Sequence, residues 1–220
     1  LTSKKSLPNY SWHNLFCSSF LESHSFHKDN SNLKYKIQSF PKSFWHRFDW
    51  QKWTLFLHAV PGNQKNQSGH FHEDLTSFVL FYDGNEIFID SGRRSYEHND
   101  EIANFQKSSL GHNSILINGL GPGLMPNQKR YPSFYKSSSV TISHNIRQDG
   151  LCVQLKHNGF NRGFSNVGEH IREFSINEKG VEIKDKILGS RFVNIDEFFY
   201  FSTNIELNDA KEAKSSEMNF

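Results

Sequence analysis

The chain has 220 residues, which is enough for one sizeable domain and a short additional segment. Its 25 basic and 23 acidic residues give a formal net charge of +2. No block of Lys and Arg forms a basic patch, so we expect no binding to nucleic acid. The longest apolar runs, "FVLFY" and "FFYF", are far shorter than the roughly 20 residues that cross a bilayer, so we expect no membrane span.

The composition divides the chain into three parts. Residues 1–45 are rich in Ser, Lys, Asn and His and read as a linker, in which the amphipathic stretch "SWHNLFCSSFLE" favours a short helix. Residues 46–208 carry the aromatic and alternating patterns of a folded domain. Residues 209–220 form a polar tail. Cys17 and Cys152 allow one disulfide at most, so no disulfide scaffold is expected.

Several short strands with turn signals between them follow one another in the domain. "LTSFVLFYDGNEIFID" predicts a hairpin that turns at Asp83 and Gly84. "SSVTISHNIRQDGLCVQLKHN" and "HIREFSINEKGVEIKDKILG" predict two more, and "FVNIDEFFYFSTNIEL" predicts a late strand pair or one long bent strand. Helical periodicity is almost absent. The pattern therefore predicts an all-β fold, an antiparallel β-sandwich, preceded by a mostly irregular or helical segment.

The third hairpin predicts a buried ion pair. If Ile176 pairs with Val181 across "NEKG", then Arg172 faces Asp185, and both lie on the apolar face of their strands. Paired in this way the two charges satisfy each other, whereas either one alone would be costly to bury. A slip of one residue in the register would instead place both side chains in solvent.

The segment "SGHFHEDLTSFVLF", residues 68–81, places four titratable groups directly before a strand of apolar residues. In an extended strand His70 and His72 share a face, and zinc is commonly held by His and Asp from separate segments. Asp90 and His112, each where a strand meets a loop, could complete such a site. Strict alternation puts His72 and Asp90 on opposite faces, so a shared metal requires a bulge or bend within residues 72–77. The spacing by itself fits either a metal site or unrelated surface histidines.

These motifs resemble the C-terminal β-sandwich of the heparinase II/III-like family of polysaccharide lyases, which has alginate lyases among its relatives. The likeness spans about residues 38–190 and is specific in the stretch from 69 to 119. The family pattern joins His-x-His-x-Asp, a following Ser-Phe, an Asp-Pro/Ser-Gly strand end, a Tyr, and an "Ala-His-Asn" that opens the next strand. The matching positions here are His70, His72, Asp74, Ser77, Phe78, Asp90, Ser91, Gly92, Tyr96, His112 and Asn113.

The resemblance implies a role for each matching residue. It implies that His72, Asp90 and His112 bind a structural zinc ion. It implies that His70 faces the substrate cleft and helps to bind a uronic acid or to neutralise its carboxylate. Tyr96 is expected to line the same cleft and to share in catalysis. The resemblance also implies that Asn113 contacts the substrate.

The function implied by the resemblance is cleavage of an anionic, uronic-acid-containing polysaccharide by β-elimination, in the periplasm or outside the cell. In this reaction a base removes the proton at C5 and an acid assists the leaving oxygen at C4. The alternative is a carbohydrate-binding or structural sandwich without catalysis. An upstream helical domain discriminates between them, because family members carry an N-terminal helical toroid that supplies a catalytic Tyr and an Asn or His.

Three departures from the family pattern bear on the function. Gln106 and Lys107 stand where the family usually has an Arg, and Gly111 replaces the usual Ala. Residues 1–45 leave room for at most the last helix of the toroid and a linker. We therefore expect this chain by itself to lack a complete acid–base pair and to be inactive as a lyase.

Overall fold

The computed structural model describes residues 35–40, 42–60, 72–95, 100–122, 139–161, 167–189, 194–203 and 205. The helical elements are α2 (Glu101–Lys107) and the 3₁₀ turn η1 (Ser109–Gly111). The strands are β1 (Tyr35–Phe40), β2 (Trp45–Trp50), β3 (Trp53–His58), β4 (Phe78–Tyr82), β5 (Asn85–Phe88), β6 (Ser114–Ile117), β7 (Val140–Arg147), β8 (Gly150–His157), β9 (Val167–Asn177), β10 (Gly180–Gly189) and β11 (Ile195–Phe198).

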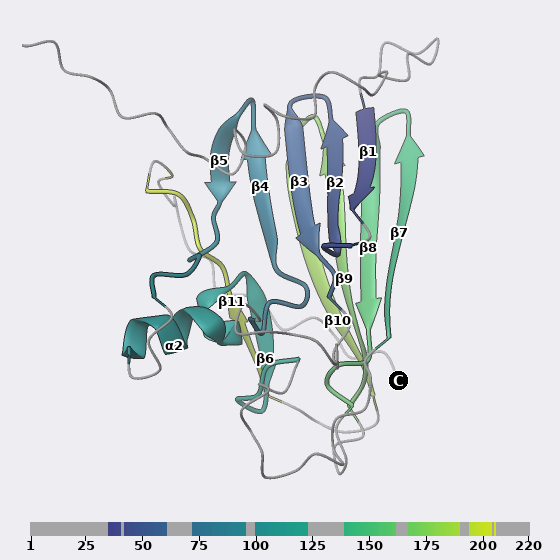
Figure 1. Ribbon diagram of the computed structural model, residues 1–220. Helices are drawn as coiled ribbons and strands as arrows, with labels where there is room; N and C mark the ends of the chain where they lie inside the picture. The colour runs from purple at the N-terminus through teal and green to yellow at the C-terminus, as the bar shows by residue number, and fades with distance from the viewer. Residues whose placement is uncertain are drawn as a thin grey trace, which may run out of the picture.

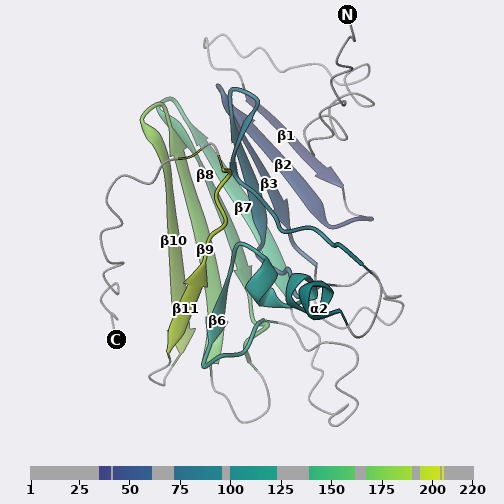
Figure 2. The ribbon, with the colours of Figure 1, turned by 90° about the vertical axis from the view of Figure 1, so that its left-hand side faces the viewer.

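Two antiparallel sheets pack face to face, which confirms the predicted β-sandwich. One sheet has the order β1-β2-β3-β4-β5, and the other has the order β10-β9-β8-β7. Figure 1 shows the first sheet in front of the second, and Figure 2 shows the two layers from the side. A small third sheet of β11 and β6 lies beside α2 at one end of the sandwich (Figure 2).

The main hydrophobic core lies between the two large sheets. Its strands alternate between buried and less buried positions, as expected for a sheet with one face turned inward. The aromatic rings of Phe78 and Phe174 meet edge to face across the layers, with their centroids 5.0 Å apart. The buried members of this core are Phe48, Trp50, Leu55, Leu57, Phe78, Leu80, Leu151, Val153, Phe174 and Ile176.

The first predicted hairpin forms β4 and β5 around the predicted turn. Asp83 and Gly84 both adopt positive φ, at 50° and 79°, the backbone that a two-residue type I′ turn requires. The pairing then departs from a strict ladder, because Phe81 opposes Glu86 while Leu80 opposes Phe88. Ile87 is therefore the extra residue of a β-bulge. Residues after it are shifted by one position against β4, which reverses the face that strict alternation would assign to them.

The second predicted hairpin is present, and the third is present with the predicted register. In β7 and β8, Ile142 opposes Leu155 and Ile146 opposes Leu151. In β9 and β10, Val181 opposes Ile176 and Asp185 opposes Arg172. The apolar residues that alternate along each arm therefore meet on one face.

Other parts of the chain differ from the sequence-based expectation or lie outside the described residues. β1 begins at Tyr35 and joins the first sheet, so the sandwich starts ahead of the boundary placed near residue 45. The helix predicted in "SWHNLFCSSFLE", Cys17 and the polar tail lie outside the described residues. The late segment forms β11 and then meets β5 through a bridge between Phe88 and Phe201. Among the described residues, no helix has the length and apolar character needed to span a membrane.

Candidate metal centre

The three residues predicted to bind metal come together from three segments of the chain. His72 precedes β4, Asp90 follows β5, and His112 follows the 3₁₀ turn η1. Nδ1 of His112 lies 2.7 Å from Oδ2 of Asp90, and the centroids of the His72 and His112 rings are 5.2 Å apart. His112 is buried, whereas His72 is only partly covered. The predicted residues therefore line one site.

A bend between His72 and β4 makes this meeting possible. Thr76 has φ of 75°, in the left-handed region that a non-glycine residue rarely adopts. The amide of Ser77 donates to the carbonyl of Asp74 over 2.9 Å, which closes the turn. The predicted bend is therefore present in residues 72–77, and the β-bulge at Ile87 adjusts the opposite segment. Together they remove the conflict with strict alternation.

Hydrogen bonds hold the carboxylate of Asp90 in its charged form. The amide of Gly92 donates to Oδ1 over 2.8 Å, and the hydroxyl of Ser77 donates to Oδ2 over 3.2 Å. Burial alone would raise the pKa of Asp90, but these bonds and the His112 imidazole lower it below its usual value. Burial likewise would lower the pKa of His112, but the hydrogen bond and charge of Asp90 raise it. Asp90 and His112 thus form a coupled pair.

The opposite nitrogen of His112 lacks a hydrogen bond of regular geometry, and the Gln106 backbone gives His112 only a weaker interaction that helps to raise its pKa. This nitrogen, Nε2, is buried, and burial without a regular hydrogen bond is a costly state for a polar atom. Burial and the neighbouring His112 imidazole lower the pKa of His72, which favours the neutral form that binds metals. Two neutral imidazoles and a carboxylate are a donor set that suits zinc.

In the structure, however, Asp90 and His112 are hydrogen-bonded to each other and are not spaced as ligands of one metal ion. Donors at 2.0–2.1 Å from a tetrahedral zinc ion lie about 3.3 Å apart, whereas Asp90 and His112 approach to 2.7 Å. Among the described residues, no group of three or more His, Cys, Asp or Glu is already arranged to hold a metal ion. The residue types fit zinc, and binding it through both Asp90 and His112 would require their hydrogen bond to open.

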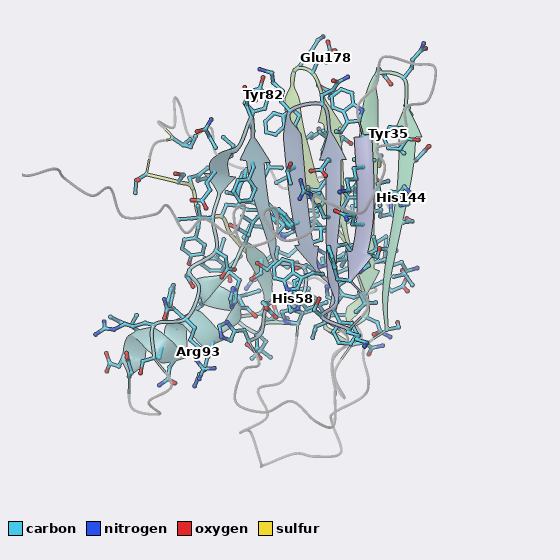
Figure 3. All side chains as sticks on the ribbon, turned by 45° about the horizontal axis from the view of Figure 1, so that its top comes forward. Tyr35, His58, Tyr82, Arg93, His144 and Glu178 are labelled. Atoms are coloured by element: carbon cyan, nitrogen blue, oxygen red, sulfur yellow. The ribbon has the colours of Figure 1, made fainter. Side chains whose placement is uncertain are left out.

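A second histidine–carboxylate pair beside the site was not anticipated. Oδ2 of Asp74 lies 2.8 Å from Nδ1 of His58, and the Trp45 indole stacks on the His58 ring at 4.6 Å between centroids. His58 ends β3, at the same end of the sandwich as Arg93 near α2 (Figure 3). This pair depends on the pairing of β3 with the segment before β4, for which the local sequence carries no signal.

A family model described as "Heparinase II/III-like, C-terminal" matches residues 33–216 of the chain. The chain belongs to the heparinase II/III-like family. No curated protein matches it significantly. A mutant heparan sulfate lyase from Pedobacter heparinus is 14% identical and has a TM-score of 0.54, with 76% of this chain and 24% of that chain covered. A heparinase III gene product is 17% identical with a TM-score of 0.56, with 80% and 25% covered. These two likenesses show the fold alone, and the chain spans about a quarter of each relative's length.

Gln106, which stands near the position where the heparinase II/III-like family usually has an Arg, has a structural role in this chain. Nε2 of Gln106 donates to the carbonyl of Ser91 over 2.8 Å, and Oε1 accepts from the amide of Arg94 over 2.6 Å. Gln106 thereby ties α2 to the segment after Asp90. Close by, the carbonyl of Lys107 accepts from the amide of Glu73 over 2.8 Å. The helix therefore supports two of the three segments that form the site.

Asn113 has a structural role, in place of the substrate contact that the resemblance implied. Its side chain is fully buried, and Nδ2 donates to the carbonyls of Phe78 and Ile89, each over 2.8 Å. Its Oδ1 accepts from the amide of Tyr200 over 2.7 Å. These bonds use the amide to join β4, the end of β5 and the late segment. His70 and Tyr96 lie outside the described residues.

The predicted pair of Arg172 and Asp185 lies deep between the sheets and belongs to a larger network. The guanidinium donates twice to the carboxylate, from Nε over 2.8 Å and from Nη2 over 2.7 Å. Two buried histidines that the sequence did not reveal extend the network. His170 contacts Oδ1 of Asp185 at 2.6 Å, and His157 contacts His170 at 2.8 Å. The carboxylate of Asp185 is strongly stabilised by this setting, and its pKa lies far below the usual range despite burial.

Proposed function

We propose that this chain is the sandwich part of a polysaccharide lyase that cleaves uronic-acid-containing glycans by β-elimination. We also propose that it holds a structural zinc ion through His72, Asp90 and His112. The observation that carries the proposal is the meeting of these three side chains, from separate segments, in a chain of the heparinase II/III-like family. A periplasmic or secreted location stays a prediction of the family resemblance.

The metal fits a structural role because it would lie between the segments that the bend and the bulge bring together. Zinc bound there supplies a rigid link among three loops. His72 immediately follows the segment that contains His70, so fixing His72 also restricts where His70 can point. The chain's own contribution is therefore to hold one wall of a substrate cleft in a fixed shape.

His70 suits the role of neutralising the substrate carboxylate. Removal of the C5 proton develops negative charge on the adjacent carboxylate, and a hydrogen bond or positive charge placed there stabilises the transition state. Tyr96, on the segment after Asp90, is proposed to line the same cleft. Both assignments rest on the family motif. The remaining acid–base groups are proposed to come from a helical domain that forms the second wall.

The test compares the 220-residue chain with a longer form that includes the upstream helical domain. Formation of the unsaturated product is followed by its ultraviolet absorbance on alginate, heparan sulfate and hyaluronan. We expect binding without turnover by the short chain and turnover by the longer form. His70→Ala in the longer form should lower kcat/KM by about 10²- to 10³-fold, the usual loss when one group that stabilises transition-state charge is removed.

The matched control is His144→Ala, because His144 is an exposed histidine on β7, in the opposite sheet (Figure 3). It should leave turnover unchanged. If the longer form binds these glycans but never cleaves them, the chain is a carbohydrate-binding sandwich and the lyase proposal is wrong. If the short chain cleaves them and His70→Ala abolishes cleavage, the proposed division between two domains is wrong.

A further inference from the structure

Arg172 is the most deeply buried charged residue among those that the structure describes, with a side chain that is 0% exposed. It projects from β9 into the region where the sandwich meets the site-bearing loops. Its guanidinium carbon lies 5.6 Å from the ring centroid of Phe78 and 5.6 Å from that of Phe199. Two aromatic rings from two other segments therefore fix its position.

The guanidinium makes two bonds beyond those to Asp185. Nη1 donates to the carbonyl of Asn113 over 2.6 Å and to the carbonyl of Thr76 over 3.1 Å. One nitrogen thus joins two segments that are separated by more than thirty residues in the sequence. The planar fork of Arg allows this, since one edge serves the carboxylate while Nη1 remains free for the carbonyls.

Each of these two carbonyls belongs to a segment that carries the metal centre. Thr76 is the left-handed residue of the bend after His72, and the hydroxyl of the next residue donates to Asp90. Asn113 directly follows His112 in the sequence. Arg172 therefore connects the backbone behind one side of the site to the backbone behind the other.

A directional chain of hydrogen bonds holds Asp185, and with it Arg172. The amide of Gly159 donates to Nδ1 of His157 over 3.0 Å, so Nε2 of His157 carries the proton that is donated to His170. His170 then donates from Nε2 to Asp185. Every polar atom in this series has a partner, so the carboxylate and the guanidinium have one arrangement.

We propose that Arg172 is a positioning residue of the metal centre, which fixes His72 and His112 relative to each other through the carbonyls of Thr76 and Asn113. The inference rests on the proposed zinc site for its functional meaning. The Arg172–Asp185 pair then orients the metal-binding histidines as well as stabilising the packing of the sandwich. Loss of the guanidinium fork leaves both carbonyls without their shared donor.

The first test measures zinc affinity by competition with a chromophoric chelator. Arg172→Lys keeps the charge but cannot serve the carboxylate and both carbonyls at once. Arg172→Met/Asp185→Leu removes the pair without leaving a buried unpaired charge. Both variants should bind zinc 10- to 100-fold more weakly, the usual effect of losing a residue that orients ligands. Leu151→Ala, a core change on β8 near the far end of the sheet, lowers stability but should leave zinc affinity unchanged.

The second test uses metal-free protein, so that it does not depend on zinc. Amide hydrogen exchange is measured in residues 72–78 and 108–114 and compared with global unfolding of the same protein. Both Arg172 variants should speed exchange in these segments by more than the loss of global stability explains, and Leu151→Ala should not. Faster local exchange in a protein that binds no zinc would retain the positioning role and overturn the metal. Unchanged local exchange and unchanged zinc affinity in both variants would overturn the positioning role.

Discussion

Two histidine–aspartate pairs in this molecule have nearly the same contact distance but different surroundings. His112 lies 2.7 Å from Asp90, and His170 lies 2.6 Å from Asp185. The second nitrogen of His170 is bonded to His157, whereas the second nitrogen of His112 lacks a hydrogen bond of regular geometry. The Asp185 side chain is 4% exposed and that of Asp90 is 18% exposed. The Asp185 network is closed and structural, while the Asp90 pair ends at a ring nitrogen without a regular hydrogen bond and is the more exposed of the two.

The two histidine–aspartate pairs illustrate two uses of buried charge. In the Asp185 network every polar atom is satisfied internally, so burial is tolerated and the fold is specified. At Asp90 the carboxylate and His112 are bonded to each other through Nδ1, while Nε2 of His112 lacks a hydrogen bond of regular geometry. The Asp90–His112 pair, which is less completely hydrogen-bonded within the protein, is therefore the candidate binding site of the two.

The largest expected effect comes from breaking the closed network on one side. Asp185→Ala leaves the Arg172 guanidinium buried without its carboxylate and should lower the free energy of unfolding by about 3 to 5 kcal/mol. The Arg172→Met/Asp185→Leu double variant should lose less, because neither charge remains. Urea denaturation at pH 7 measures both. Equal, small losses in the two variants would show that the pair contributes little to the fold.

A smaller effect is expected from protonating the closed network. Burial, and the charges of His170 and Arg172, hold the pKa of His157 well below 6.5, and burial also lowers that of His170 although Asp185 opposes the shift. The unfolded chain binds protons on both rings near pH 6.5, but the folded chain does not. Stability should therefore fall as the pH drops below about 6.5, by up to about 1.4 kcal/mol per pH unit for each histidine.

His157→Gln isolates this contribution, because the amide can still donate to His170 but does not titrate. Unfolding free energies of the wild type and the variant are compared at pH 7, 6 and 5. The variant should be less stable at pH 7 and should lose less stability on acidification. Identical slopes in the two proteins would assign the pH dependence to other groups.

The smallest effect is expected at the third pair, His58 and Asp74, which is partly exposed. Asp74→Asn keeps the shape and one acceptor oxygen but removes the charge. The free energy of unfolding should fall by about 0.2 to 1 kcal/mol, the range for a partly exposed ion pair, because the 2.8 Å contact lacks hydrogen-bond geometry. A loss as large as that of Asp185→Ala would mean that the exposed fraction of a pair does not determine its contribution to the free energy of unfolding.

The sequence predicted those features that depend on alternation within one hairpin. The register of β9 and β10 follows from the apolar residues on each side of "NEKG", so the pairing of Arg172 with Asp185 could be predicted. His157 and His170 could not be paired in advance, because their contact depends on how β8 lies against β9. The bend at residues 72–77 was inferred as a requirement of the site.

Other features had no local signal. The bulge at Ile87 interrupts the pairing of β4 with β5, although the residues around it have the alternation of an uninterrupted strand. Asn113 was assigned to the substrate from the family motif, in which it directly follows His112. The structure uses its amide to satisfy three backbone groups from separate segments, which sequence alone does not bring together. The meeting of His72, Asp90 and His112 was predicted from the family motif, since spacing alone fitted two readings.

Whether His72, Asp90 and His112 form a metal centre is decided by the zinc content of the purified 220-residue chain. The wild type should contain close to one zinc per chain after equilibration and removal of free metal. The His72→Ala/His112→Ala variant should contain none, while His144→Ala should retain the full amount. Stoichiometric zinc in the double variant would contradict the assignment of these ligands, and a wild-type chain without zinc would contradict the metal centre itself.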